Sequence, residues 1–327
     1  MMSIRDRQTY VRPAGEIPGV IETIGLAYTR LLARPWIVLG PIILDLYLWL
    51  GLKITAGPLV LKIADSIRPI AAIGDSVAKF VEGQAQYNLA ELLSMHLFVI
   101  RMPTFMPMID LDESVRLADW GPELSSGPWG LLGALVPLFI AAGFGGGAAF
   151  LLMVGDVSRG AAPRFDARLT IRTGYRLLLW VLAGAGLFVL ISWPLLVVQA
   201  ALIYAGSGVN GIVLFLLSIP TGLGFVLFFF SAYAIVLDGA TATEAFRSSY
   251  RVVRAYGWQS LAFIVSYMIA TGGFPFFWRL LVDEPPGTLI AIIGNAFIST
   301  GMIAAGMIYY EDRHAIVGSG DPVFQAG

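Results

Sequence analysis

The strongest constraint on the fold of this chain is a series of long apolar runs. A helix needs roughly 20 mostly apolar residues to cross the hydrocarbon core of a bilayer. Six runs approach or exceed that length and lie at residues 36–54, 128–154, 177–205, 211–237, 258–281 and 287–310. Open backbone groups cannot face hydrocarbon, and the runs lack the alternation of barrel strands. The sequence therefore predicts an all-α, polytopic transmembrane helical bundle with six spans.

The composition agrees with lipid surroundings and excludes several kinds of chemistry. Of the 327 residues, 57% are apolar and only 13% are charged. The chain has no cysteine, which excludes disulfides, thiolate nucleophiles, zinc–thiolate sites and iron–sulfur clusters. Its net charge of −1 lacks the basic excess of a nucleic-acid-binding surface. We therefore predict no enzyme activity, no cofactor, no metal site and no nucleic-acid partner.

The positions of lysine and arginine predict the orientation in the membrane. The segments before the first span, between the second and third, between the fourth and fifth, and after the sixth contain 14 of the 21 basic residues. Basic residues resist translocation, so these segments are predicted to be cytoplasmic. We expect a bacterial cytoplasmic (inner) membrane protein with both termini in the cytoplasm. Its parts would be a cytoplasmic N-terminus (1–35), the transmembrane domain (36–310) and a cytoplasmic tail (311–327).

One connection, residues 56–127, is much longer than the others. It contains nine acidic and five basic residues, which places it outside the cell in this topology. Its apolar spacing predicts short helices that lie on the outer membrane surface or pack over the bundle. His96 lies there among leucines and could ligate a haem or chlorophyll metal, although a single histidine more often only packs.

A juxtamembrane pattern recurs three times, at residues 28–36, 175–180 and 250–258. Each copy begins with tyrosine, contains arginine and ends at tryptophan just before or within an odd-numbered span. The chain therefore reads as three hairpins, each preceded by a cytoplasmic amphipathic helix. Before the fifth span, Thr241 and Glu244 have the spacing of a capping box and predict where such a helix begins.

Two rows of arginine occupy these juxtamembrane segments. They are Arg164, Arg168, Arg172 and Arg176 before the third span, and Arg247, Arg251 and Arg254 before the fifth. Such rows suit anionic lipid headgroups, at about 1 kcal/mol for each basic residue near the surface. The same rows are also typical of simple positive-inside anchoring or of an acidic protein partner, and their spacing does not distinguish these alternatives.

The third unit carries a family resemblance. Residues 244–254, Trp258 and the closing segment 309–313 resemble the six-span membrane domain attached to some bacterial glycerophosphodiester phosphodiesterases, and its stand-alone relatives. The resemblance covers mainly residues 239–313. It implies a membrane module without an enzyme activity, because hydrolysis in that family belongs to a separate soluble barrel domain that this chain lacks.

Few polar side chains lie inside the predicted spans. Asp45 is the one ionisable residue deep in a span, at a cost of about 2.5–3.5 kcal/mol unless it is paired, protonated or wetted. It could hydrogen-bond to polar groups such as Gln199 or Asn295, or it could carry protons or bind a cation. Gly143 and Gly147 form a GxxxG face for close packing within the chain or against another subunit.

Two functional hypotheses follow from these residues. The first is a non-catalytic membrane scaffold or accessory subunit that docks lipids or other membrane proteins, because polar residues inside the spans are few. The alternative is a small transporter or channel-like protein with a midplane site near Asp45 and Asn295, built from helices that proline interrupts.

Overall fold

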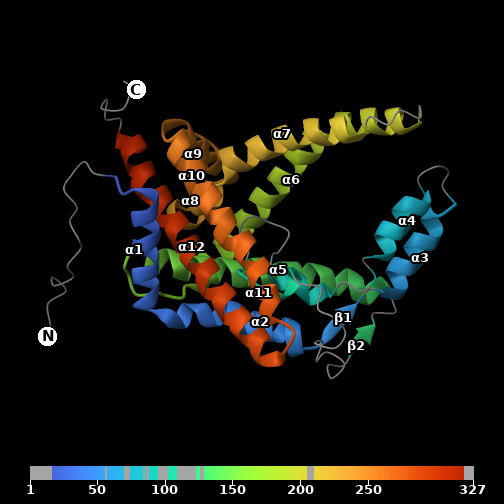
Figure 1. Cartoon of the computed structure of the whole chain (residues 1–327), viewed down its shortest axis with the longest axis horizontal. Coiled ribbons are helices and arrows are strands. Elements are labelled where there is room, and N and C mark those ends of the chain that lie inside the picture. The colour runs from blue at the N-terminus through green and yellow to red at the C-terminus, as the bar shows by residue number, and fades with distance from the viewer. Residues whose placement is uncertain are drawn as a thin grey trace.

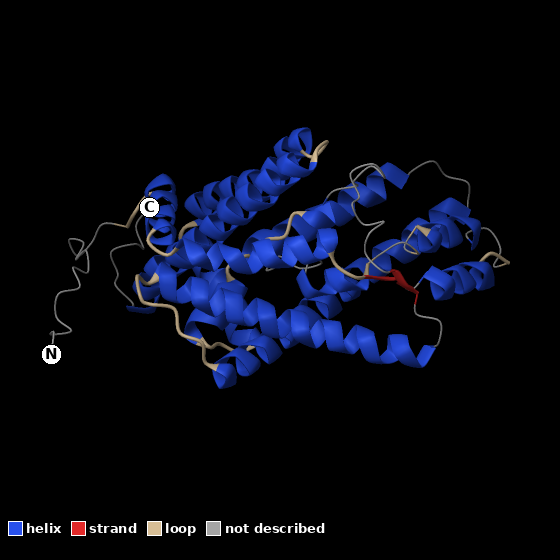
Figure 2. Ribbon diagram, turned by 90° about the horizontal axis from the view of Figure 1, so that it is seen from below, coloured by secondary structure: helices blue, strands red, loops and turns tan. Residues whose placement is uncertain are grey.

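The computed structural model describes residues 17–55, 57–69, 74–83, 85, 88–94, 102–108, 123–125, 129–204 and 210–319. This part of the chain is almost entirely helical (Figures 1 and 2). Five helices are long and apolar enough to cross a membrane, or six if one bent pair is counted as a single span. The predicted all-α class is therefore confirmed, and five or six candidate spans replace the definite six.

The bent pair begins the first unit. Helix α1 (Val20–Leu32) and helix α2 (Leu39–Leu50) are joined by the 3₁₀ turn η1 (Pro35–Val38), and the chain bends there by 94°. Proline lacks the amide that would continue α1, so it begins a new helix in another direction. Helix α2 ends at Leu50, four residues before the predicted end of the first span.

The long connection is built from short elements. Strand β1 (Lys53–Thr55) pairs in parallel with β2 (Glu123–Ser125), so this two-stranded sheet brings the two ends of the long connection together. Helices α3 (Gly57–Ile67) and α4 (Gly74–Glu82) pack side by side at the end farthest from both chain termini (Figure 1). The 3₁₀ segments η2 (Leu89–Ser94) and η3 (Met106–Met108) return to the helical body, where η2 packs on α5.

Helix α5 (Trp129–Ser158) corresponds to the second predicted span and completes the first unit, and the second unit begins with α6 (Ala167–Tyr204) and α7 (Asn210–Phe228). We predicted a separate amphipathic helix before the third span, and this is wrong for the second unit. Arg168, Arg172 and Arg176 of the basic row belong to the same continuous helix as the span, α6, and Arg164 lies three residues before it. The reason is local, because no proline occurs between Ala167 and Pro194, whereas Pro35 breaks the first unit.

The predicted fourth span, residues 211–237, is divided between two helices. Helix α7 ends at Phe228, and after a two-residue turn α8 (Ser231–Asp238) continues to Gly239, whose φ of 63° is left-handed. Helix α9 (Ala242–Ala255) then begins at the predicted capping box, in which the Thr241 amide donates to the Glu244 carboxylate over 2.8 Å. This start signal is confirmed.

The third hairpin consists of one interrupted helical arm and one continuous helix. Its first arm runs through α10 (Gly257–Met268), the π-helical turn η5 (Ile269–Gly273), α11 (Phe274–Trp278) and the 3₁₀ turn η6 (Arg279–Leu281). The π turn lies just before Pro275, which cannot donate a helical hydrogen bond. Its second arm is the single helix α12 (Pro285–Ser319).

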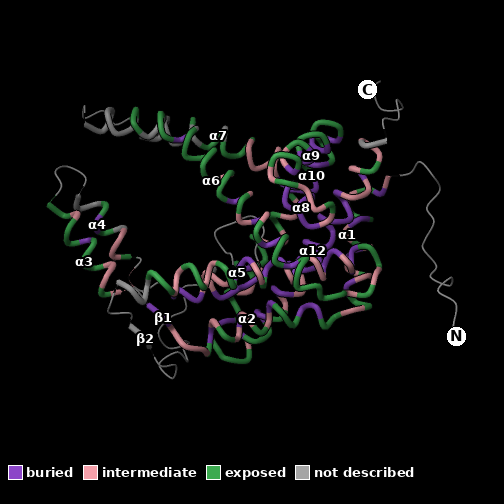
Figure 3. The backbone as a smooth tube through the Cα atoms, turned by 180° about the vertical axis from the view of Figure 1, so that it is seen from behind, coloured by how far each residue is buried: buried purple, intermediate pink, exposed green. Residues whose placement is uncertain are grey.

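Helix α12 is the centre of the fold. The main apolar core joins it to α1, α5, α8, α9 and α10, and buried residues concentrate there (Figure 3). Three of its glycines leave room for aromatic rings of other elements, and the pairs are Gly294 with Trp278, Gly301 with Tyr28, and Gly306 with Tyr233. We call these the glycine notches of α12. They allow ring-to-backbone contact that any larger residue would prevent.

Candidate functional site

The buried carboxylate of Asp45 holds an irregular loop inside the helical body. Asp45 is fully buried on α2, and the Phe105 amide donates to both of its oxygens over 2.8 Å. The Met106 amide donates to Oδ1 over 3.0 Å. Irregular backbone inside a bundle has no water to satisfy it, so a carboxylate that accepts both amides removes that cost. Asp45 therefore anchors residues 102–108, which we call the anchored loop.

Apolar packing holds the same loop from another side. The ring of Phe105 is fully buried in a small cluster with Trp49 of α2 and with Val282 and Ile292 near the start of α12. The sequence suggests polar side chains such as Gln199 or Asn295 as partners for Asp45, but its observed partners are backbone amides of the long connection. No side-chain pattern could have revealed them. The predicted partner Gln199 and the possible ligand His96 lie outside the described side chains.

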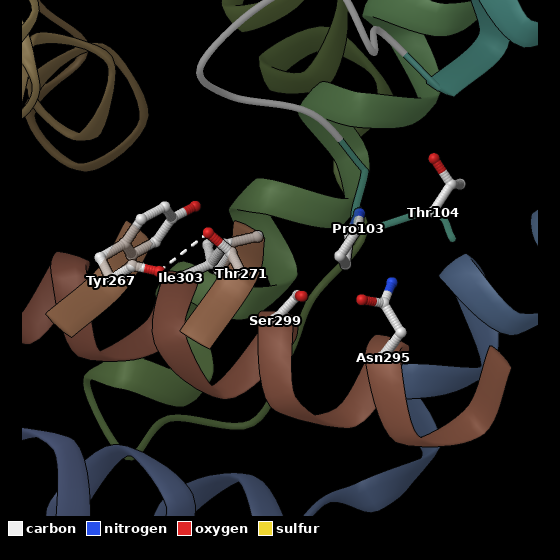
Figure 4. Close-up of a pocket in the computed structure, with 7 residues that line it drawn as sticks. All are labelled: Pro103, Thr104, Tyr267, Thr271, Asn295, Ser299 and Ile303. Atoms are coloured by element: carbon white, nitrogen blue, oxygen red, sulfur yellow. Dashed lines mark hydrogen bonds between the residues drawn. The ribbon is translucent and has the colours of Figure 1, made fainter. Parts of the chain in front are cut away.

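Asn295 lies apart from that carboxylate, in a small pocket of its own. It is 2% exposed, and the pocket has a volume of about 10 Å³ (Figure 4). The lining residues are Pro103, Thr104, Tyr267, Thr271, Asn295, Ser299 and Ile303. Asn295 is about 15 Å along α12 from Pro285, which is half the thickness of a bilayer core of about 30 Å. The space suits one water-sized guest and no larger solute.

Four arginines bind backbone carbonyls where helices end on the side of the molecule that carries α1 and α9. We call them the arginine collar, and their acceptors are Ser158 for Arg30, Gly160 for Arg34, Leu237 for Arg159, and Gly239 for Arg176. The last carbonyls of a helix have no partner within it, and a cation there also opposes the negative end of the helix dipole. Arg176, predicted to bind lipid or a partner, is thus engaged inside the protein.

The other predicted basic residues are exposed. They are Arg164, Arg168 and Arg172 near the start of α6, and Arg247, Arg251 and Arg254 on α9. Helices α6 and α9 are in contact, so both groups lie on the side of the collar. A surface hollow of about 460 Å³ is lined by Glu244, Arg247, Tyr250 and Arg251. These arginines remain open to an anionic headgroup or an acidic surface.

The predicted glycine face on α5 allows close approach within the chain. A Cβ atom on Gly143 would lie 2.6 Å from the carbonyl oxygen of Leu92 and 3.2 Å from the Cα of Leu93. Gly147 is buried one helical turn away on the same face. The neighbour is η2 of the long connection, so glycine here accommodates the connection instead of another span.

A polar cluster joins α8, α9 and α12 beside the collar. Tyr310 donates to Asp238 over 2.7 Å, its oxygen is 2.8 Å from the Ser248 hydroxyl, and Nδ1 of His314 is 3.6 Å from Asp238. The partner of Ser248 is a phenol, not an imidazole, so the cluster lacks the nucleophile–base pair of a hydrolase. Among the described residues, no group of three or more acidic or histidine side chains could hold a metal ion.

The outer parts of α6 and α7, residues 182–204 and 210–223, extend away from α12 (Figures 1 and 3). We call this hairpin the α6–α7 arm. None of residues 182–190 is buried. Its exposed large apolar residues are Leu182, Leu187, Phe188, Val189, Leu190, Trp193, Val197, Val198, Phe215, Leu216, Ile219 and Leu223. A Cβ atom on Gly184 or Gly186 would meet nothing within 4 Å, so the backbone of the arm is open to a neighbour.

These features define the class of this protein as a helical chain with five or six helices suited to crossing a membrane. The chain belongs to the family described as a domain of unknown function, DUF7847, whose model matches residues 115–309. No curated protein and no solved structure matches the chain. The family match covers α5 to α11 and α12 as far as Tyr309, and it leaves out α1, α2 and the anchored loop. Asp45 and the loop that it binds therefore lie outside the matched part.

Proposed function

We propose that the protein is a non-catalytic scaffold of the bacterial cytoplasmic membrane, whose α6–α7 arm docks a transmembrane helix of a partner subunit. The exposure of the arm is the observation that carries this proposal. Helices associate in lipid through close van der Waals packing, for which small residues are suited. Residues 183–186 of the arm are alternating alanine and glycine, and in the described structure three of them are exposed and Gly184 is partly exposed.

The use of the buried polar groups supports a scaffold over a transporter. Both oxygens of Asp45 accept hydrogen bonds from backbone amides, so the carboxylate binds the anchored loop and not a solute. The arginine collar is likewise committed to helix ends. The pocket at Asn295 has room for about one water molecule. A solute that crosses the membrane would need a larger polar cavity.

The exposed arginines fit a cytoplasmic side for α9 and the start of α6. In that orientation they would meet anionic headgroups, at about 1 kcal/mol for each residue near the surface. The positive-inside argument and the exposure of these side chains support the same orientation. The resemblance to the phosphodiesterase membrane domain stays a prediction, and it too is consistent with a membrane module that lacks a catalytic domain.

In-cell photo-crosslinking tests the docking proposal. A photo-reactive amino acid is placed at Leu190 on the arm, which is 71% exposed, or at the control position Phe276 on α11, which is 66% exposed. We expect a protein adduct of defined mass from position 190 and lipid adducts alone from position 276. Lipid adducts alone from both positions would show that the arm meets only lipid, and would contradict the proposal.

A second candidate function, transport, is favoured by one specific arrangement. The pocket at Asn295 lies between an irregular loop and the π-helical turn η5, and interrupted helices build the central sites of many transporters. Liposome flux assays with wild type and Asn295→Ala separate the two functions. The scaffold proposal expects the same flux as protein-free liposomes, whereas flux that the substitution abolishes would establish transport instead.

A further inference from the structure

The pocket at Asn295 is formed by three parts of the chain that are far apart in sequence. Pro103 and Thr104 come from the anchored loop, and Tyr267 and Thr271 come from the broken arm of the third hairpin. Asn295 and Ser299 lie one turn apart on α12 and extend toward Pro103 (Figure 4). Whatever occupies this space therefore touches the long connection and both arms of the third hairpin.

The polar groups around the pocket are not satisfied by one another. The hydroxyl of Thr104, a residue that is 1% exposed, has no hydrogen-bond partner in the described structure. Asn295 is 2% exposed and Ser299 is 5% exposed, and both residues line the pocket. The Thr271 hydroxyl donates to the carbonyl of Tyr267 over 2.9 Å and keeps its own lone pairs free. A buried hydroxyl without a partner destabilises the folded protein.

From the size and the chemistry of this space, we infer that the pocket holds one ordered water molecule. A buried water needs about 10–15 Å³ and two to four polar partners. The volume of about 10 Å³ and the polar groups of Thr104, Asn295 and Ser299 meet both conditions. None of the described lining residues is charged, so a cation would lose its hydration shell without a neighbouring anion in the pocket wall.

The bound water gives the anchored loop a second polar attachment. Asp45 holds the amides of residues 105 and 106 from α2, and the water joins residue 104 to α12. The position of the loop is thereby coupled to both α2 and the third hairpin. This inference concerns internal structure and does not depend on the proposed docking of a partner.

A matched pair of substitutions tests the water site. Thr104→Val and Thr300→Val each replace a buried, unpartnered hydroxyl with a methyl group of the same shape, but Thr300 does not line the pocket. We expect Thr104→Val to lower the unfolding temperature of the detergent-purified protein by roughly 2–4 °C, because a water-mediated link is lost. Ser299→Ala should act in the same direction. Thr300→Val should leave the unfolding temperature unchanged or raise it.

Two further measurements identify the occupant directly. A density map of the purified protein should show one peak within hydrogen-bonding distance of Asn295 and Ser299. Exchange of sodium chloride for choline chloride should leave the unfolding temperature unchanged. The inference is wrong if Thr104→Val behaves like Thr300→Val, if the map shows an empty pocket, or if sodium raises the unfolding temperature of wild type but not of Ser299→Ala, which would identify a cation.

Discussion

Helices α12 and α6 are similar in length, at 35 and 38 residues, but they have opposite surroundings. In α12, 67% of the most apolar window is buried inside the chain, whereas in α6 the share is 18%. Both helices are apolar enough to cross a membrane. Apolar content therefore identifies helices suited to lipid, but it does not distinguish a helix that other helices surround from one that faces outward.

The two helices differ in the contacts that their glycines make with other elements. The glycine notches of α12 receive aromatic rings from α1, α8 and α11, and its buried tyrosines reach α9 and α10 through hydroxyl contacts. Among the described residues, no atom would lie within 4 Å of a Cβ atom on Gly184 or Gly186 of α6. Glycine thus has two roles, one among the packed helices around α12, which we call the packed body, and one in the exposed α6–α7 arm. We expect substitutions in these two regions to change the free energy of unfolding by different amounts.

The largest effect is expected from Asp45→Ala in the packed body. Removing the carboxylate leaves the amides of Phe105 and Met106 buried without acceptors, at about 1–3 kcal/mol each. Thermal unfolding in detergent should show a marked loss of stability. Asp45→Asn keeps one carbonyl acceptor and should lose less. An unfolding temperature of Asp45→Ala equal to that of wild type would mean that the anchored loop does not depend on this residue.

The next effect compares a filled glycine position with an open one. Gly301→Ala places a methyl group against the ring of Tyr28 and should destabilise the protein by about 1–3 kcal/mol. Gly184→Ala meets open space and should be neutral or stabilise α6 by up to about 1 kcal/mol. Denaturation of both variants in detergent measures the difference. Equal losses would show that the arm is as tightly packed as α12.

A smaller loss of stability is expected from substitutions of arginine, and it should differ between the arginine collar and the exposed arginines of α6. Arg176→Gln removes the charged donor to Gly239 and should cost roughly 1–2 kcal/mol, because that carbonyl ends a helix. Arg168→Gln lies on the same helix but is exposed, and should stay within about 0.5 kcal/mol of wild type. The same denaturation series checks both. A greater loss for Arg168→Gln would reverse the assignment of structural and surface roles.

The smallest effect concerns the capping box of α9. Hydrogen bonds from the Thr241 amide and hydroxyl lower the pKa of Glu244 below its usual value. The ionised carboxylate therefore stabilises the start of α9 above its ordinary pKa, and this contribution is lost as the pH falls through the lowered value. The protection of first-turn amides against hydrogen exchange, relative to the exchange of an unstructured peptide at the same pH, should fall at acidic pH in wild type. In Glu244→Gln this protection should not depend on pH in that range.

Parts of the fold could be predicted because their signals are local. Apolar runs located most of the helices suited to spanning, and the capping box placed the start of α9 at Thr241, since the two residues that form it are three positions apart. The break at Pro35 and the continuity of α6 also have local causes. The structure has a separate helix, α1, before the first span, whereas the helix predicted before the third span is part of α6. Within the candidate site, sequence singled out Asp45 and Asn295 as polar residues in apolar surroundings.

By itself, then, the sequence determined the helical class, the approximate helices suited to lipid and the residues too polar for their position. Only the tertiary structure decided that Asp45 meets amides 60 and 61 positions away, that Arg176 turns to Gly239, and that Gly301 receives Tyr28. The physical reason is that hydropathy and capping act between neighbours in the chain. Contacts with backbone amides, carbonyls and glycines depend on groups that every residue shares, so their partners leave no pattern in the sequence.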